Sequence, residues 1–218
     1  MSDNIILKPN EIDAWGEKIF RNWTNRYFEI FTVAGKIDKD LYSPVHLYSG
    51  YVYQKINEQL RNADHDNDMY GDHSKEIMLL KLALVSAPVL PKGMTIYRWV
   101  TPNVLNEIIA RYEEGNSPYC EKGFMSTTLD PSIVEHSDVI DHNFKLLKIT
   151  VPDDTHAIYT DLIQNRSEKE LILLPDCYLQ YTGIKNTNEY FGYEQYEINL
   201  IHFHPHMYPH TKDSSRIL

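Results

Sequence analysis

The stretch Arg166-Ser-Glu-Lys-Glu-Leu-Ile-Leu-Leu-Pro175 decides how this chain is interpreted. Its apolar run, Leu171 to Leu174, is typical of a buried strand. Glu168 and Glu170 lie two residues apart just before that run, and on a strand they would share one face. Neighbouring carboxylates repel each other, so the pair costs energy unless a functional site uses it. The pair therefore fits either the wall of a catalytic cleft or a solvated strand end.

The composition is that of a globular domain with an acidic balance. Of the 218 residues, 42% are hydrophobic and 24% are charged, which is enough for one domain with a sizeable core. The net charge of −10 argues against nucleic-acid binding, because phosphate contacts need clustered Lys and Arg. Cys120 and Cys177 are too few for a disulfide framework.

No segment of the sequence predicts membrane targeting or insertion. Residues 1–9 lack the basic and apolar regions of a signal peptide. The chain also has no run of about 18 apolar residues, the length that a membrane-spanning helix requires. We therefore expect a protein that does not reside in a membrane, and delivery across one by another route stays open.

Hydrophobic periodicity predicts helices first and mostly strands afterwards. The predicted helices are Glu11–Phe31 with Asn10 as the N-cap, Ser49–Arg61, Ser74–Ser86 and Pro102–Glu113. The predicted strands are Met94–Trp99, Gly123–Thr128, Lys145–Val151, His156–Tyr159, Glu168–Leu174, Tyr178–Ile184 and Tyr193–Phe203. This order favours an α+β fold over regular βαβ alternation. Neither a Rossmann nor a P-loop glycine motif occurs.

Two groups of residues resemble metal ligands, but each lacks part of such a site. The aspartates of segment 62–73 are spaced as in a calcium loop, yet Met69 replaces the turn glycine and Lys75 the bidentate glutamate. Three alternating histidines would share one face of a strand, as a transition-metal site or as an exposed polar edge. They are His202, His204 and His206. Pro205 interrupts that strand, and we expect no bound metal.

Three short motifs follow one another along the predicted strands. They are Tyr97-Arg98, Gly123-Phe-Met-Ser126-Thr127-Thr128 and Glu168-Lys169-Glu170. From Arg98 to Ser126 there are 28 residues, and from Ser126 to Glu168 there are 42. In this order the motifs resemble the arginine–serine–glutamate signature of arginine-type mono-ADP-ribosyltransferases. The motif sequences are similar to those of the enzymatic components of iota-type clostridial binary toxins.

The resemblance extends over roughly residues 42–203. Tyr48, Tyr53 and Asn57 match the helix that contacts NAD in that family. The family's fold would place N-terminal helices on two small, roughly perpendicular β-sheets that form an NAD cleft. Residues 1–41 would then be an N-terminal helical segment, residues 42–205 the catalytic domain and residues 206–218 a C-terminal tail.

The resemblance also implies a reaction. ADP-ribose would pass from NAD to a protein acceptor, usually an arginine, with release of nicotinamide. The transition state is oxocarbenium-like, and a carboxylate near the ribose stabilises its positive charge. Glu170 matches that carboxylate. Glu168 matches the family residue that orients and deprotonates the acceptor guanidinium.

The other motif residues would bind NAD. Arg98 would hold the diphosphate through a charge-assisted contact. Ser126 would hydrogen-bond the catalytic glutamate and shape the nicotinamide pocket, and Gly123 would let the backbone approach the nicotinamide amide. The chain departs from many toxin relatives at Trp99, where they carry a second basic residue, and at Thr128, where serine is commoner. The acidic segment 129–143 corresponds to the family's loop that helps to hold NAD.

These expectations define the partners and the alternatives. The acceptor would be a target protein, an immunity protein or a delivery system would be a further partner, and neither nucleic acid nor membrane would be bound. The protein would be secreted or injected into a target cell and act in its cytoplasm. Two other functions stay open: an NAD glycohydrolase with water as the acceptor, and an inactive binding module. The intact carboxylate pair argues against the inactive module.

Overall fold

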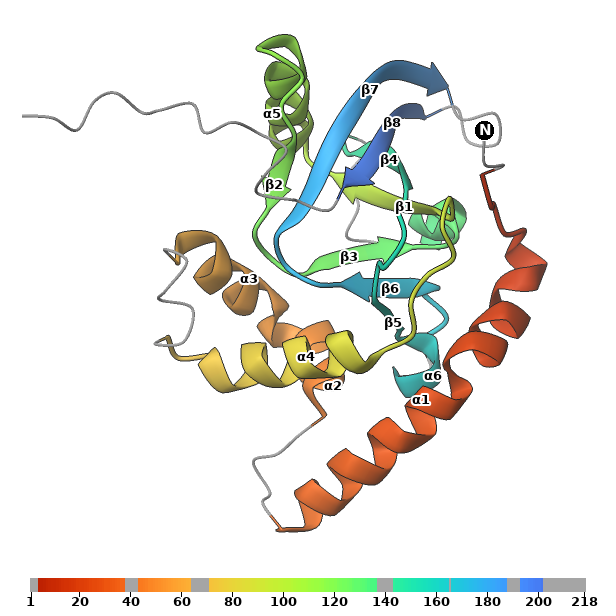
Figure 1. The fold of residues 1–218 in the computed structure, drawn as a ribbon, viewed down its shortest axis with the longest axis vertical. Coiled ribbons are helices and arrows are strands. Elements are labelled where there is room, and N and C mark those ends of the chain that lie inside the picture. Colours follow the sequence, from red (N-terminus) through yellow and green to blue (C-terminus); the bar gives the residue numbers. More distant parts are fainter. Residues whose placement is uncertain are drawn as a thin grey trace, which may run out of the picture.

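A computed structural model describes residues 4–37, 43–63, 71–136, 143–164, 166–187 and 193–201. The helices are α1 (Pro9–Ile37), α2 (Pro44–Leu47), α3 (Tyr53–Asn62), α4 (Ser74–Ser86), α5 (Pro102–Glu113) and α6 (Asp161–Gln164), with a π-helical turn at Tyr48–Val52 and a 3-10 turn at Pro131–His136. The strands are β1 (Thr95–Val100), β2 (Tyr119–Glu121), β3 (Met125–Thr128), β4 (Lys145–Thr150), β5 (Ala157–Tyr159), β6 (Glu170–Leu173), β7 (Cys177–Thr187) and β8 (Glu194–Ile201). The α+β class is confirmed (Figure 1).

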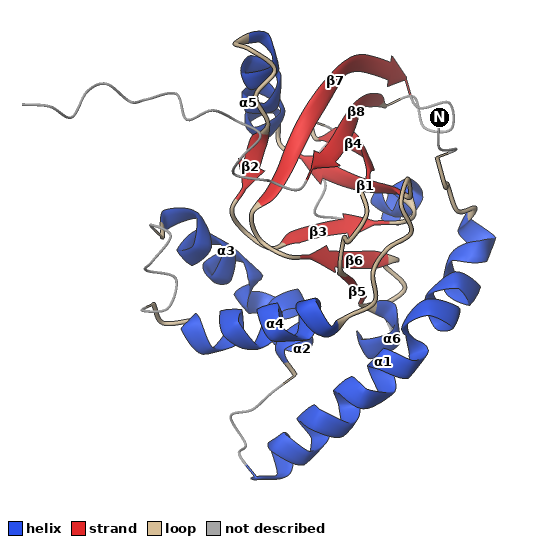
Figure 2. Ribbon diagram, in the orientation of Figure 1, coloured by secondary structure: helices blue, strands red, loops and turns tan. Residues whose placement is uncertain are grey.

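The strands form one hydrogen-bonded series in the order β2-β7-β8-β4-β1-β3-β6-β5. The two expected sheets are its two halves, which meet where β1 pairs with β3 at a single register position, Tyr97 opposite Thr128. Figure 2 shows β7 and β8 crossing the direction of β3 and β6. The halves are therefore joined at their backbones rather than separate, because β1 belongs to both.

Both faces of the β3–β6–β5 half are buried. Leu171 and Leu173 belong to the core that α1 covers, whereas Ile172 belongs to the core of α2, α3 and α4. Successive side chains on a strand point to opposite faces. A strand with a core on each side therefore carries a continuous apolar run, which is the pattern that the sequence shows after Glu170.

Most predicted elements are confirmed, and the differences have local causes. Helices α4 and α5 occupy the predicted ranges. Helix α1 begins at Pro9, so Asn10 lies inside it and is not its N-cap, and the helix extends to Ile37. The predicted helix Ser49–Arg61 is broken, because Gly50 adopts a non-helical conformation (φ −89°, ψ −131°) inside the π-helical turn. Strand β2 and helix α6 were not predicted, since three or four residues are too short for a periodic pattern.

Several sequence-based expectations fall outside the described residues. They concern the aspartate-rich residues 64–70, most of the acidic loop after residue 136, the histidines from His202 onward and the tail 206–218. The expected boundary at residues 41 and 42 also lies in a gap. Among the helices that can be described, none combines the length and apolar character needed to span a bilayer.

Helix α1 packs closely against β5. Ile12 and Phe20 of α1 are fully buried in the sheet core. Gly16, which lies between them, has no side chain, and a Cβ atom there would overlap the ring of Tyr159 on β5. The absence of a side chain at residue 16 therefore sets how near the helix comes to the strand.

Gly16→Ala is expected to destabilise the protein by about 1–3 kcal/mol, because overpacking against the Tyr159 ring outweighs the better helix propensity of alanine. Thermal unfolding of the two proteins measures the effect. Asn22→Ala, at an exposed position of the same helix, is the matched control and should keep or slightly raise the melting temperature. A Gly16→Ala protein as stable as the control would contradict the close packing.

Candidate active site

A cleft of about 600 Å³ opens where β1, β3 and the start of β6 meet. The strand pairing produces it: Tyr97 on β1 lies opposite Thr128 on β3, and Thr128 lies opposite Glu170 on β6. The lining includes four of the predicted site residues, which are Arg98, Ser126, Glu168 and Glu170. Motifs from three separate parts of the chain therefore meet in one cleft.

Glu170 is the first residue of β6 and is half-buried in the cleft. Burial raises the pKa of its carboxyl group, and the negative charge of Glu168 adds to this shift. Hydrogen bonds from Ser126 and Thr160, together with the positive charge of Arg166, act in the opposite direction. A carboxylate held by two hydroxyl groups at the floor of a cleft is not a solvated strand end.

Glu168 does not share a strand face with Glu170, so the prediction of a paired arrangement on one strand was wrong. Strand β6 begins only at Glu170, and the preceding turn has left-handed backbone conformations at Ser167 (φ 55°) and Lys169 (φ 50°). Glu168 is exposed to solvent. The turn thus presents two carboxylates in different surroundings, one wet and one half-buried.

Arg98 is held by a buried carboxylate that the sequence did not reveal. Its Nη2 lies 2.9 Å from Glu121 Oε2, and the Glu121 side chain is only 3% exposed. The guanidinium of Arg61 binds the same carboxylate, with Nε 3.0 Å from Oε1 and Nη2 3.2 Å from Oε2. Two guanidinium groups share one carboxylate, so the cluster keeps a net positive charge.

The cluster has unused hydrogen-bonding capacity. Nη1 of Arg98 is buried and has no hydrogen-bond partner among the described residues. Arginine forks match phosphate oxygens in geometry and charge. One feature of the sequence indicated that Arg61 lies near the site: it follows the predicted site residue Asn57 by four residues, which places both on the same helical face. Nothing local marked Glu121 as the partner of both arginines.

Tyr48, Asn57 and Gly123 lie behind the wall of the cleft and outside its lining. The Asn57 side chain accepts from the backbone N–H of Phe124 at 2.9 Å and donates to its carbonyl at 3.3 Å. The Tyr48 hydroxyl donates to the same carbonyl at 3.1 Å and is hydrogen-bonded to Ser126. A Cβ at Gly123 would lie 2.9 Å from Asn57 Oδ1. These residues fix the backbone that leads into β3.

Tyr53 is the most exposed of the predicted NAD-binding residues. It begins α3 and is 40% exposed. Its ring centroid lies 6.4 Å from that of Tyr48, in an edge-on arrangement. The direct NAD contacts expected for Tyr48, Tyr53 and Asn57 stay predictions.

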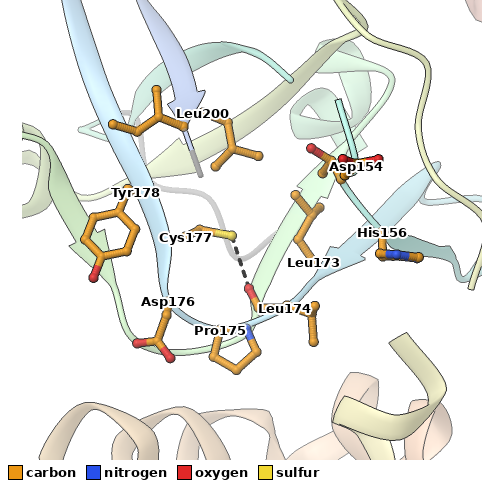
Figure 3. Close-up of a pocket in the computed structure, with 11 residues that line it drawn as sticks. Asp154, His156, Leu173, Leu174, Pro175, Asp176, Cys177, Tyr178 and Leu200 are labelled. Carbon is orange, nitrogen blue, oxygen red and sulfur yellow. Dashed lines mark hydrogen bonds between the residues drawn. The ribbon is translucent and has the colours of Figure 1, made fainter. Parts of the chain in front are cut away.

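A second cavity, of about 430 Å³, lies at the other end of β6 (Figure 3). The Cys177 thiol in its wall donates to the Leu174 carbonyl at 3.1 Å, and burial raises the pKa of that thiol to about 12. Asp154 and Asp176 also line this cavity. It offers a neutral thiol, two carboxyl groups and one histidine, His156, whose Nδ1 is hydrogen-bonded to the Ala87 carbonyl at 2.7 Å. No arginine or lysine among the described residues lines it, so it suits a diphosphate less well than the first cleft does. Within the described ranges no cluster of three metal-ligating side chains occurs.

The sequence matches the family model described as ADP-ribosyltransferase exoenzyme over residues 12–203. The chain therefore belongs to the ADP-ribosyltransferase exoenzyme family. It is an NAD-dependent mono-ADP-ribosyltransferase of the toxin type, and NAD is its substrate. No curated protein matches the sequence.

Solved structures of bacterial toxins share the fold. Plx2a from Paenibacillus larvae matches with a TM-score of 0.66 and 17% identity, over 91% of this chain and 99% of that one. The Clostridium limosum C3 exoenzyme matches with a TM-score of 0.64 and 17% identity, over 92% and 97%. The Vis toxin from Vibrio splendidus matches with a TM-score of 0.56 and 20% identity, over 92% and 89%. The fold expected from the three motifs is thus confirmed.

Glu170→Gln is expected to raise stability at neutral pH. The folded state raises the pKa of this carboxyl group above its ordinary value of 4.5. The stability that Glu170 contributes is therefore complete below the unfolded pKa and is lost as pH rises through the folded pKa. The amide of glutamine does not titrate. In thermal melts from about pH 4 to pH 8, the melting temperature of the variant relative to that of the wild type should increase as pH rises.

Glu58→Gln removes one charge at an exposed position of α3 and is the matched control for that pH series. Its melting temperature should follow that of the wild type. Identical pH dependence of the Glu170 and Glu58 variants would contradict the burial of the Glu170 carboxylate.

Proposed function

We propose that this protein transfers ADP-ribose from NAD to an arginine side chain of a protein acceptor. The observation that carries the proposal is the convergence of Arg98, Ser126, Glu168 and Glu170 in one cleft, with one half-buried and one exposed carboxylate two residues apart. The arginine–serine–glutamate subclass is part of the proposal. So is the action of the protein as a secreted or injected toxin inside a target cell.

NAD binding would use both arginines that surround Glu121. The diphosphate would meet Arg98 and Arg61, and the nicotinamide riboside would extend toward Ser126 and Glu170. When the bond between ribose C1′ and the nicotinamide nitrogen breaks, the bonding electrons leave with nicotinamide, which departs as a neutral molecule. The positive charge stays on the ribose. The Glu170 carboxylate, through a hydrogen bond to a ribose hydroxyl, stabilises that charge as it develops.

Glu168 would receive the acceptor at the mouth of the cleft. A guanidinium group is protonated at neutral pH, so it pairs with an exposed carboxylate. As its nitrogen forms the new bond to C1′, the proton passes to Glu168. The Vis toxin has been solved with agmatine, a guanidinium compound, which supports a guanidinium acceptor for this fold.

Hydrolysis of NAD is the competing outcome of the same chemistry. Because Glu168 is exposed, water reaches it as readily as a protein side chain does. Water that attacks C1′ would release free ADP-ribose. Transfer and hydrolysis therefore have to be measured side by side.

Glu170→Gln is expected to lower both transfer and nicotinamide release by about 100-fold or more, because both reactions pass through the same charged ribose. Glu168→Gln is expected to lower transfer by a similar factor and to retain much of the slow NAD hydrolysis. Labelled NAD with agmatine or a cell lysate reports transfer, and nicotinamide release reports cleavage. Equal losses of both activities in Glu168→Gln would contradict this division of roles.

Arg98→Lys is expected to raise the KM for NAD about tenfold with a smaller change in kcat, since lysine keeps the charge but lacks the planar fork. Steady-state kinetics of nicotinamide release measures both constants. Arg111→Lys, at an exposed i,i+4 ion pair with Glu107 on α5, is the matched control. An unchanged KM in Arg98→Lys would remove this arginine from the NAD site.

A further inference from the structure

The lysine between the two glutamates is fixed by two carboxylates. Lys169 Nζ lies 2.5 Å from Asp13 Oδ1 on α1 and 3.3 Å from Asp161 Oδ2 on α6. The Lys169 side chain is only 16% exposed, and that of Asp161 only 9%. The Tyr159 hydroxyl donates to the same two aspartates, at 3.0 and 3.2 Å. The central residue of the glutamate turn thus points away from the cleft into a network of its own.

Asp161 also binds the backbone of the turn. Its Oδ1 accepts the N–H of Glu168 at 3.0 Å and the N–H of Lys169 at 3.1 Å. One carboxylate therefore holds both the main chain and the lysine side chain of the turn. Asp161 begins α6 two residues after the core strand β5 ends at Tyr159, so its position is set by the core.

The carbonyl groups of the turn are held from the opposite side. The Thr128 hydroxyl donates to the Glu168 carbonyl at 3.1 Å, and the backbone N–H of Leu129 donates to the Lys169 carbonyl at 3.0 Å. Lys169 has a left-handed backbone conformation, which a residue with a side chain keeps only where its surroundings impose it. The main chain at Glu168 is therefore fixed, while its side chain is exposed.

We propose that Asp161 is a positioning residue that holds Glu168 toward the acceptor, and that Lys169 completes the link between this turn and α1. The inference rests on the proposed function, since it concerns the residue assigned to the acceptor. Neither Asp161 nor Lys169 lines the cleft. Their effect on the reaction would pass through the backbone of the turn.

The effect should be selective because the two glutamates are anchored differently. Glu170 is paired with Thr128 in the sheet, and its carbonyl oxygen accepts a hydrogen bond from the Thr160 N–H at 3.0 Å. Glu168 lies before the strand, and its backbone N–H is held by Asp161. A displacement of about 1 Å in a reacting group lowers rates by about 100-fold. Loss of the Asp161 contacts should therefore impair transfer more than NAD cleavage.

The test compares Asp161→Ala, Asp161→Asn and Lys169→Gln in three assays: transfer to agmatine, nicotinamide release without acceptor, and thermal unfolding. We expect Asp161→Ala to lower the kcat of transfer about tenfold or more, with the KM for NAD and nicotinamide release within about twofold of wild type. Asp161→Asn keeps an oxygen that accepts the backbone N–H groups, so its loss of transfer should be smaller. The kcat of transfer in Lys169→Gln should also lie between those of the wild type and of Asp161→Ala.

Asp153→Asn is the matched control. Asp153 pairs with Lys92 at 2.6 Å on the exposed surface, so the substitution removes the same charge from a lysine pair outside the cleft. Its ratio of transfer to nicotinamide release should equal that of the wild type. If Asp161→Ala does not fold, the same ratio in Asp161→Asn and Lys169→Gln decides the question.

Two results separate the failure of this inference from the failure of the proposed function. A wild-type protein that cleaves NAD but does not modify agmatine or any lysate protein refutes arginine transfer. A wild-type protein that transfers, with an unchanged ratio of transfer to nicotinamide release in all three variants, refutes only the positioning role. A parallel loss of both activities and of stability would mark Asp161 as a structural residue.

Discussion

The pairing of β3 with β6 is the constraint on which the rest of the structure depends. It sets Ser126 opposite Ile172 and Thr128 opposite Glu170. The same register puts Leu171 into one core and Ile172 into the other. A shift of one residue would exchange the two faces of the strand and move the Glu170 carboxylate out of the cleft. The register that stabilises the fold is therefore also the register that assembles the cleft.

The electrostatic properties of the charged groups around the cleft depend on how far each group is buried and on which partners it has. Glu121 is buried, and this is tolerable because two guanidinium groups and the Gly123 N–H bind it. Among the described residues, Glu170 has hydroxyl donors and the positive charge of Arg166 around it, and these do not offset the burial that raises the pKa of its carboxyl group. The two carboxylates differ because ion pairing neutralises Glu121, whereas Glu170 would act on the ribose in the proposed reaction.

The parts of the fold and of the site that could be predicted from the sequence are those that depend on neighbouring residues in the chain. Helices α4 and α5 were predicted at their observed bounds because periodicity and proline positions are local properties. The three motifs were also local, and the fold brings them together as expected. The turn at Glu168 was mispredicted as strand, because its left-handed conformations depend on Asp161, a tertiary contact. The Arg61–Glu121 pair joins residues 60 apart in the chain, so no window of sequence contains it.

The ion pair between Arg98 and Glu121 has a consequence for the entropy of ligand binding. A long arginine side chain that is free in solvent loses rotamer freedom when it meets a ligand, and that loss weakens the complex. Here the guanidinium is already anchored on one edge by Glu121, while its Nη1 has no partner in the described part of the chain. Most of the ordering has therefore occurred during folding. Under the proposed function, the internal carboxylate of Glu121 would therefore preorganise the site, because the arginine side chain that binds the dinucleotide would already be ordered before NAD arrives.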